Sequence, residues 1–138
     1  MRLLSGVVVV SGIYDVLLGG ALLFALEGVR QLFGTEPPLF PIHANLNGLF
    51  ALAVGLGYFA ILKNLEANRW YIWIMGPLLK GGGALLFLVD FAVRDSPPVF
   101  VVFAASDGLL AIVTVVALLK SAHRNQGDGA PARGHPGT

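Results

Sequence analysis

Apolar residues fill four long stretches of the chain, and most charged residues fall between them. The stretches cover about residues 3–26, 44–62, 70–91 and 99–119. Each is close to the roughly 20 residues that a helix needs to cross about 30 Å of hydrocarbon. Because backbone amides in lipid must be paired within their own segment, the pattern predicts helices. We therefore expect an all-α integral membrane protein with four spans.

The sequence also repeats itself. Residues 19–24, Gly-Gly-Ala-Leu-Leu-Phe, recur without change as residues 82–87. Three further matches follow in order: Glu27 with Asp90, Pro37-Pro38 with Pro97-Pro98, and Asn47-Gly48-Leu49 with Asp107-Gly108-Leu109. Ordered matches of this kind predict an internal duplication, two tandem copies of one helical hairpin. Short connections make sequential helices antiparallel, so we expect a four-helix bundle with a pseudo-twofold axis along the membrane normal.

Small residues indicate which helix faces should meet. Close approach of backbones favours helix packing in lipid, so faces rich in glycine and alanine are expected at the bundle centre. The second helix supplies such a face with Ala44, Gly48, Ala51 and Gly55. The first helix supplies Gly19-Gly20, and the third supplies Gly81-Gly82-Gly83.

Composition supports a membrane protein of one domain. The 138 residues are 56% hydrophobic and only 12% charged, against roughly 25% charged in soluble domains. The absence of cysteine excludes disulfides, thiolate metal sites and thiol redox chemistry. We expect a transmembrane domain over 1–120 and a flexible tail over 121–138, which is rich in Gly, Pro and Ala. The first stretch is too long for a cleaved signal peptide, and Asp15 interrupts it.

Basic residues are distributed unequally between the two sides of such a bundle. One side carries six of them: Arg2, Lys63, Arg69, Lys120, Arg124 and Arg133. The other side carries only Arg30 and Arg94. The positive-inside rule therefore predicts that both termini are cytoplasmic. Trp70, Tyr71 and Trp73 follow Arg69 as an aromatic anchor at the cytoplasmic interface.

Three ionisable residues lie deep within different spans. Counted from the cytoplasmic ends, Asp15, Lys80 and Asp107 fall about 15–18 Å into the membrane at about 1.5 Å per residue. An unpaired charge at that depth costs at least about 3 kcal/mol. We therefore predict that Lys80 pairs with Asp107, Asp15 or both. Asn47 joins this polar cluster as the repeat counterpart of Asp107, because its amide can donate to a carboxylate or accept from Lys80.

The cluster has two interpretations. It either fixes the register of the bundle or forms a working site, as intramembrane ionisable residues commonly do. The backbone around Lys80 favours the second. Residues 75–83 contain Pro77 and four glycines, and proline interrupts helical hydrogen bonding. Transporters place binding sites at such interrupted helices near the midplane.

Glu27, His43 and Asp90 form a secondary, outward-facing group. They could make a shallow metal site, but the interpretation we favour is that the acids mark helix ends in the headgroup zone, so no metal is predicted. Tyr14, Ser11 and Thr114 are further polar candidates, although Ser and Thr often bond their own helix. No phosphate-binding loop or catalytic motif is present in the sequence, so we predict no catalytic residue.

Two groups of residues carry a resemblance to known families. Leu17–Phe24 followed by Gly28–Gly34 resembles the first helix of DoxX-like proteins, which are small four-span bacterial membrane proteins. Tyr14-Asp15, Leu79-Lys80-Gly81 and Asp107-Gly108-Leu109 are similar to motifs of uncharacterised bacterial membrane proteins of this size. The resemblance covers about residues 5–120 and implies a four-helix bundle in a bacterial inner membrane. DoxX is associated with quinone-linked sulfur oxidation, but no residue here matches a known catalytic position.

These observations lead to two expected functions. The first is a non-enzymatic, DoxX-like accessory or interaction subunit, or a protein that binds a small apolar ligand such as a quinone or lipid. The alternative is a small proton- or ion-coupled transporter in which Lys80 exchanges partners between Asp15 and Asp107, acting as an oligomer. No nucleic-acid partner is expected, and no cofactor beyond such a quinone or lipid.

Overall fold

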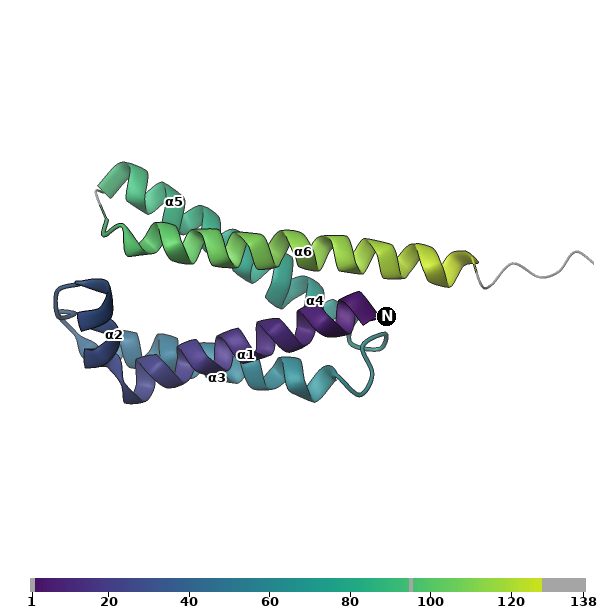
Figure 1. The fold of residues 1–138 in the computed structure, drawn as a ribbon, viewed down its shortest axis with the longest axis horizontal. Coiled ribbons are helices and arrows are strands. Elements are labelled where there is room, and N and C mark those ends of the chain that lie inside the picture. Colours follow the sequence, from purple (N-terminus) through teal and green to yellow (C-terminus); the bar gives the residue numbers. More distant parts are fainter. Residues whose placement is uncertain (1, 95, 128–138) are drawn as a thin grey trace, which may run out of the picture.

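The computed structural model describes residues 2–94 and 96–127. Regular secondary structure in this part of the chain is entirely helical (Figure 1). The elements are α1 (Arg2–Phe24), α2 (Leu26–Phe33), α3 (Pro41–Ile61), α4 (Arg69–Trp73), η1 (Ile74–Gly81), α5 (Gly82–Arg94) and α6 (Val99–Gly127). Four stretches are long and apolar enough to cross a membrane: Arg2–Phe24, Pro41–Ile61, Arg69–Arg94 and Val99–His123. The predicted all-α fold with four spans is confirmed.

Two helix boundaries differ from the prediction. α3 begins at Pro41 rather than near residue 44, because proline suits the first turn of a helix, where its missing N–H leaves no bond unmade. α6 continues to Gly127, so residues 121–127, expected as part of the tail, are helical. Residues 120–126 contain neither Gly nor Pro, and nothing in their backbone chemistry ends the helix earlier. The remainder of the predicted tail, 128–138, lies outside the described residues.

The spans are arranged as two antiparallel hairpins. α1 packs along α3, and η1 and α5 pack along α6. The hairpins meet mainly through α1 and α6. In Figure 1 they lie closest at the end that carries the N-terminus, here called the N-terminal end, and diverge toward the opposite end.

The buried core is concentrated at the N-terminal end. Its largest members are Leu4 and Val8 of α1, Tyr58 of α3, Ile72 of α4 and Leu118 of α6. Elsewhere large apolar side chains point outward along every span, as Leu17, Leu49, Leu86 and Leu109 do. This distribution fits a bundle that is tightly packed at one end and surrounded by lipid.

Glycines bring α1 and α3 into close contact. A Cβ added to Gly19 would lie 2.5 Å from the backbone nitrogen of Leu52, and one added to Gly55 would lie 2.7 Å from that of Val16. Gly12 and Gly48 complete the contact, so the glycines of the predicted α3 face pack on α1, whereas Ala44 and Ala51 line a cavity. The expectation that Gly20, Gly82 and Gly83 pack at the bundle centre is wrong. These three have no neighbour within 4 Å of an added Cβ. Gly83 borders the cavity between the hairpins instead of a neighbouring helix.

Two features near the membrane boundaries depart from expectation. Residues 27–33, predicted as loop, belong to the short helix α2, whose C-terminus is capped by Gly34 in the left-handed conformation (φ 62°). Of the predicted aromatic anchor, Trp70 and Trp73 point outward, but Tyr71 turns inward. The Tyr71 hydroxyl donates to the carbonyl oxygen of Val54 at 2.9 Å, which satisfies its polar atom inside the bundle.

Candidate functional site

The third span changes its helical geometry at the level of the polar cluster. An eight-residue π-helix, η1, separates α4 from α5 and contains Pro77 and Lys80. Pro77 has no N–H to donate, and the wider π turn accommodates this loss within a continuous span. π-helical segments occur frequently at functional sites. The predicted interruption of the third span is therefore present, as a widened turn that carries Lys80.

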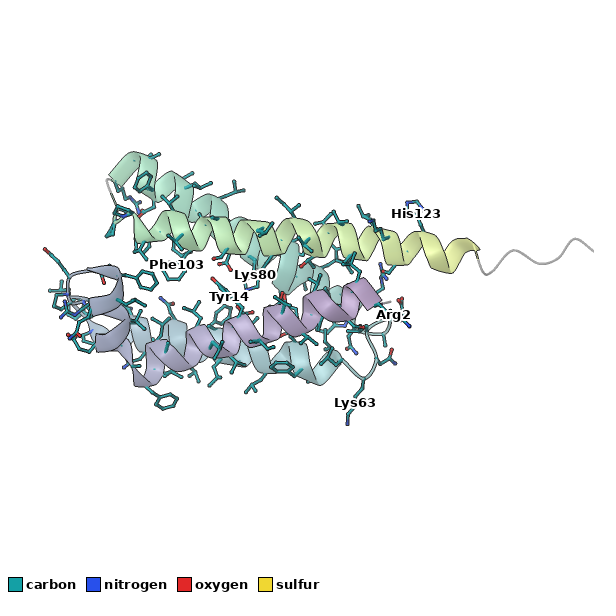
Figure 2. All side chains as sticks on the ribbon, in the orientation of Figure 1. Arg2, Tyr14, Lys63, Lys80, Phe103 and His123 are labelled. Carbon is teal, nitrogen blue, oxygen red and sulfur yellow. The ribbon has the colours of Figure 1, made fainter. Side chains whose placement is uncertain are left out.

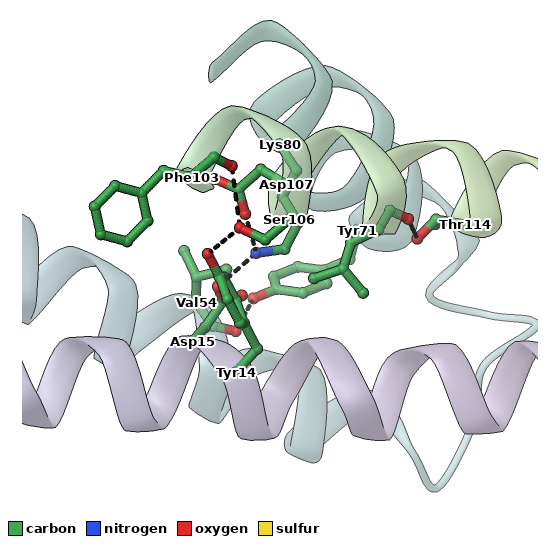
Figure 3. Close-up of polar contacts among 10 residues, drawn as sticks. Tyr14, Asp15, Val54, Tyr71, Lys80, Phe103, Ser106, Asp107 and Thr114 are labelled. Carbon is green, nitrogen blue, oxygen red and sulfur yellow. Dashed lines mark hydrogen bonds and ion pairs between the residues drawn. The ribbon is translucent and has the colours of Figure 1, made fainter. Parts of the chain in front are cut away.

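Lys80 joins three spans (Figure 3). Its Nζ donates to Asp15 Oδ1 of α1 at 2.5 Å and to Asp107 Oδ1 of α6 at 3.5 Å. The side chains are 5% exposed for Lys80, 6% for Asp15 and 17% for Asp107. The predicted ion pair thus includes both aspartates, with Asp15 as the nearer and more deeply buried partner.

Tyr14 of α1 extends this network to α6, which belongs to the other hairpin. Lys80 Nζ lies 4.7 Å from the centre of the Tyr14 ring, within cation–π range. The Tyr14 hydroxyl is 2.9 Å from Ser106 Oγ, and Ser106 donates to the carbonyl oxygen of Phe103 at 3.1 Å. Either hydroxyl can act as the donor in the Tyr14–Ser106 bond. The network ties α1 to α6 by a neutral bond as well as by the ion pair.

One carboxylate oxygen in the cluster has no donor. Asp15 Oδ2 is buried and has no hydrogen-bond partner among the described residues. A buried acceptor that is left unpaired is costly, and more so when it carries charge. When both carboxylates are ionised, the two acids and one ammonium also carry one excess negative charge. The cluster can then accept a further positive charge at Asp107, the more exposed of its two acids.

A cavity of about 480 Å³ lies against the cluster and is lined by all four spans. Figure 2 shows Tyr14, Lys80 and Phe103 directed into the space between the two hairpins. The polar lining of the cavity comes from Tyr14, Asp15, Asn47, Lys80 and Asp107. Most of the remaining wall is aliphatic or aromatic, and its aromatic members include Phe50, Phe87, Phe100 and Phe103. Cavities of about 300–1,000 Å³ that contain a few convergent polar groups are typical small-molecule sites.

Asn47 lines this cavity but does not join the ion pair. No hydrogen bond connects it to Lys80 or to either aspartate within residues 2–94 and 96–127. Lys80 instead contacts the two carboxylates, which are stronger acceptors than an amide. Asn47 remains a polar group of the cavity wall.

The secondary candidates at the outer ends do not gather into a site. Arg30 donates to Glu27 at 2.6 and 2.9 Å, and Arg94 donates to Asp90 at 2.7 Å. The ring of His43 packs edge-on against Phe40 with centroids 6.1 Å apart. The described residues contain no group of three or more His, Cys, Asp or Glu side chains able to hold a metal. Each acid is paired with the arginine one turn along its own helix, as expected for helix ends.

The hydrogen bond from Arg30 also determines the ionisation of Glu27. Together with a weaker contribution from Gln31, it lowers the pKa of the exposed Glu27 carboxyl to about 2. Ser96 also donates to Asp90. Thr114 bonds the carbonyl oxygen of Leu110 on its own helix at 2.6 Å, as an intramembrane threonine often does.

Ser106 is the member of the site that sequence reasoning missed. Its only signal was its position beside Asp107, and neighbouring residues on a helix face in different directions. Its role depends on the reach of Tyr14 from another span. No protein-family model, curated protein or solved structure matches the chain.

Proposed function

We propose that this multi-pass protein binds a small amphipathic ligand, such as a quinone or a lipid, in the cavity between its two hairpins. The ligand places its polar end at the Asp15–Lys80–Asp107 cluster and its apolar part along the aromatic wall. The protein carries out no chemical step itself and serves as an accessory subunit that holds or presents the ligand. Its setting is the bacterial cytoplasmic membrane with both termini in the cytoplasm, and its kinship is with DoxX-like proteins.

The observation that carries this proposal is the position of the cluster in the cavity wall. A buried ion pair that only fixed helix register would be enclosed by packed side chains. Here Asp15, Lys80 and Asp107 border a cavity of about 480 Å³. The tight core lies at the N-terminal end, among residues such as Leu4, Tyr58 and Leu118. The cavity and the charged cluster therefore lie at the same place, as expected of a small-molecule site.

A pair of repeat-related glycines provides the test. Gly83 lines the cavity, whereas its counterpart Gly20 is not among the lining residues. Neither has a neighbour within 4 Å of an added Cβ. Gly83→Phe should therefore fill the cavity while Gly20→Phe should not. We expect mass spectrometry to find a bound small molecule in the purified wild type and in G20F, and to find it lost from G83F. Equal amounts in all three proteins would contradict the proposal.

A proton-coupled carrier is the second candidate, and the unequal distances around Lys80 favour it. The ammonium lies 1.0 Å nearer to Asp15 than to Asp107, given contacts of 2.5 and 3.5 Å. An exchange of partner would couple the ion pair to a movement of one hairpin against the other, which is how alternating access operates in repeat-built carriers. Proteoliposomes with an internal pH-sensitive dye and an imposed membrane potential would test it. Proton flux in the wild type that is lost in a folded K80M/D15L/D107L protein supports a carrier, and absence of flux in the wild type rejects it.

A further inference from the structure

The excess charge of the cluster indicates which ligands the cavity can accept. The side chain of Asp15 is only 6% exposed, and its buried Oδ2 has no hydrogen-bond partner among the described residues. Asp107 also borders the cavity, is 17% exposed and holds Lys80 only at 3.5 Å. A ligand that enters the cavity therefore meets Asp107 as the more accessible carboxylate.

Lys80 offers less to a ligand than the aspartates do. Its ammonium has three protons. Contacts at 2.5 and 3.5 Å direct it to the two carboxylates, and the Tyr14 ring lies 4.7 Å away on a further side. A ligand that can only accept hydrogen bonds, such as a quinone carbonyl or a carboxylate, would have to compete with two aspartates for this ammonium. A ligand that donates can instead approach Asp107, whose contact with Lys80 is the longer of the two.

The aromatic part of the cavity wall is suited to a positive charge. Phe87 stacks on Phe100 with centroids 5.3 Å apart and lies 6.0 Å from Phe103. All three line the cavity. Aromatic faces attract ammonium groups and also pack against apolar bodies. Acids and aromatic rings thus border one space.

We infer that the ligand of this cavity is a lipophilic amine. Its protonated head group binds at Asp107, beside the Lys80–Asp15 pair, and its apolar body lies along Phe87, Phe100 and Phe103. This inference rests on the proposed function and specifies its ligand. One ammonium added to the cluster brings two positive and two negative charges together, which makes the buried group neutral. A neutral, hydrogen-bonded cluster is the arrangement that a low-dielectric site tolerates best.

Three probes with one tail and different head groups test the inference. They are 4-phenylbutylamine, 4-phenylbutan-1-ol and 4-phenylbutanoate, and binding is measured by equilibrium dialysis against the protein in nanodiscs, with empty nanodiscs subtracted. We expect the amine to bind about tenfold or more tightly than the alcohol, as a charge-assisted bond would provide. The acid should show no specific binding. Equal affinity for amine and alcohol would overturn the inference without the need for any variant.

Asp107→Asn tests the origin of the preference. It removes the excess charge and leaves the 2.5 Å Lys80–Asp15 pair, so the fold should persist, as circular dichroism would verify. Amine affinity should fall about tenfold or more, while alcohol affinity stays within about twofold. Adding Asn47→Asp to this variant returns one negative charge to the cavity, at the residue that corresponds to Asp107 in the other repeat. The added charge should restore part of the amine affinity. Identical amine binding by D107N and D107N/N47D would contradict the role of charge.

The same measurements separate this inference from the proposed function. If the alcohol binds as well as the amine and G83F abolishes both, the cavity is a ligand site but the amine assignment is wrong. If no probe binds the wild type more than G83F, the proposed function fails together with the inference.

Discussion

The charge of Lys80 is tolerated deep in the membrane because two carboxylates lie beside it. Lys80→Met should destabilise the protein by about 3–5 kcal/mol, since it leaves two buried carboxylates without their cation. Unfolding in detergent, followed by circular dichroism, measures this loss. The matched control is K80M/D15L/D107L, which removes every charge of the cluster and should be nearly as stable as the wild type or more so. Equal stability of K80M and the triple variant would show that the acids do not need Lys80.

Glu27 allows a pH prediction outside the membrane. Arg30 lowers the pKa of Glu27 in the folded chain to about 2, from an ordinary value of 4.5. For an acid with a lowered pKa, the ion pair contributes fully above the unfolded value and is lost as pH falls through the folded value. We therefore expect the stabilisation from this contact to be complete between pH 7 and pH 5 and to be lost as pH falls toward about 2, where Glu27 takes up its proton. The carboxyl ¹³C shift of Glu27 should titrate near pH 2 in the wild type and near its ordinary value in R30Q. Identical titrations would contradict the pairing.

Chemistry at the scale of single residues was partly predictable. The Lys80 pair followed from the large cost of an isolated charge in lipid, and three charges at one depth leave few arrangements. The roles of Ser106 and Asn47 did not follow, because a hydrogen bond depends on side-chain direction to within about an ångström. A neutral amide such as Asn47 has a smaller penalty to avoid, so nothing forces it into the cluster.

At the scale of elements, the repeated sequence predicted the hairpins but not the environment of each copy. Gly19 and Gly82 occupy the same place in identical hexapeptides. A Cβ on Gly19 would meet the backbone of Leu52 at 2.5 Å, whereas one on Gly82 would meet nothing within 4 Å. The difference arises because α1 has a closely packed partner in α3, while Gly82 sits where the third span leaves the π-helix. Helix α2 and the extent of η1 also escaped prediction, since eight-residue elements carry little periodic signal.

This pair of glycines makes a direct comparison possible. Gly19→Ala should destabilise the protein by about 1–3 kcal/mol, because the methyl group would push apart two helix backbones. Gly82→Ala should be neutral or stabilise the fold by up to about 1 kcal/mol, since alanine is the better helix former. Thermal unfolding of both variants in the same detergent measures the difference. If G82A proved the more damaging of the two, the close packing of α1 on α3 would be wrongly assigned.

At the scale of the whole molecule, the bundle was predicted but its divergence was not. Hydropathy shows which segments cross the membrane and which connections are short. It does not show how far apart two hairpins lie. The asymmetry comes from the placement of large core residues such as Leu4, Tyr58 and Leu118 at the N-terminal end. Toward the other end, small residues including Ala44, Ala51 and Gly83 face the cavity instead of a neighbouring helix. The same small residues that suggested tight packing therefore form an open wall.

The orientation of the molecule can be tested because the chain has no cysteine of its own. Glu36 and Ala67 are exposed in the connections at opposite ends of α3, and neither substitution removes a basic residue that directs topology. With cytoplasmic termini, a membrane-impermeant maleimide should label E36C in intact cells and label A67C only after permeabilisation. The reverse pattern would invert the proposed orientation. Labelling of both positions in intact cells would contradict the crossing of the membrane by α3, and with it the placement of Asp15, Lys80 and Asp107 in lipid.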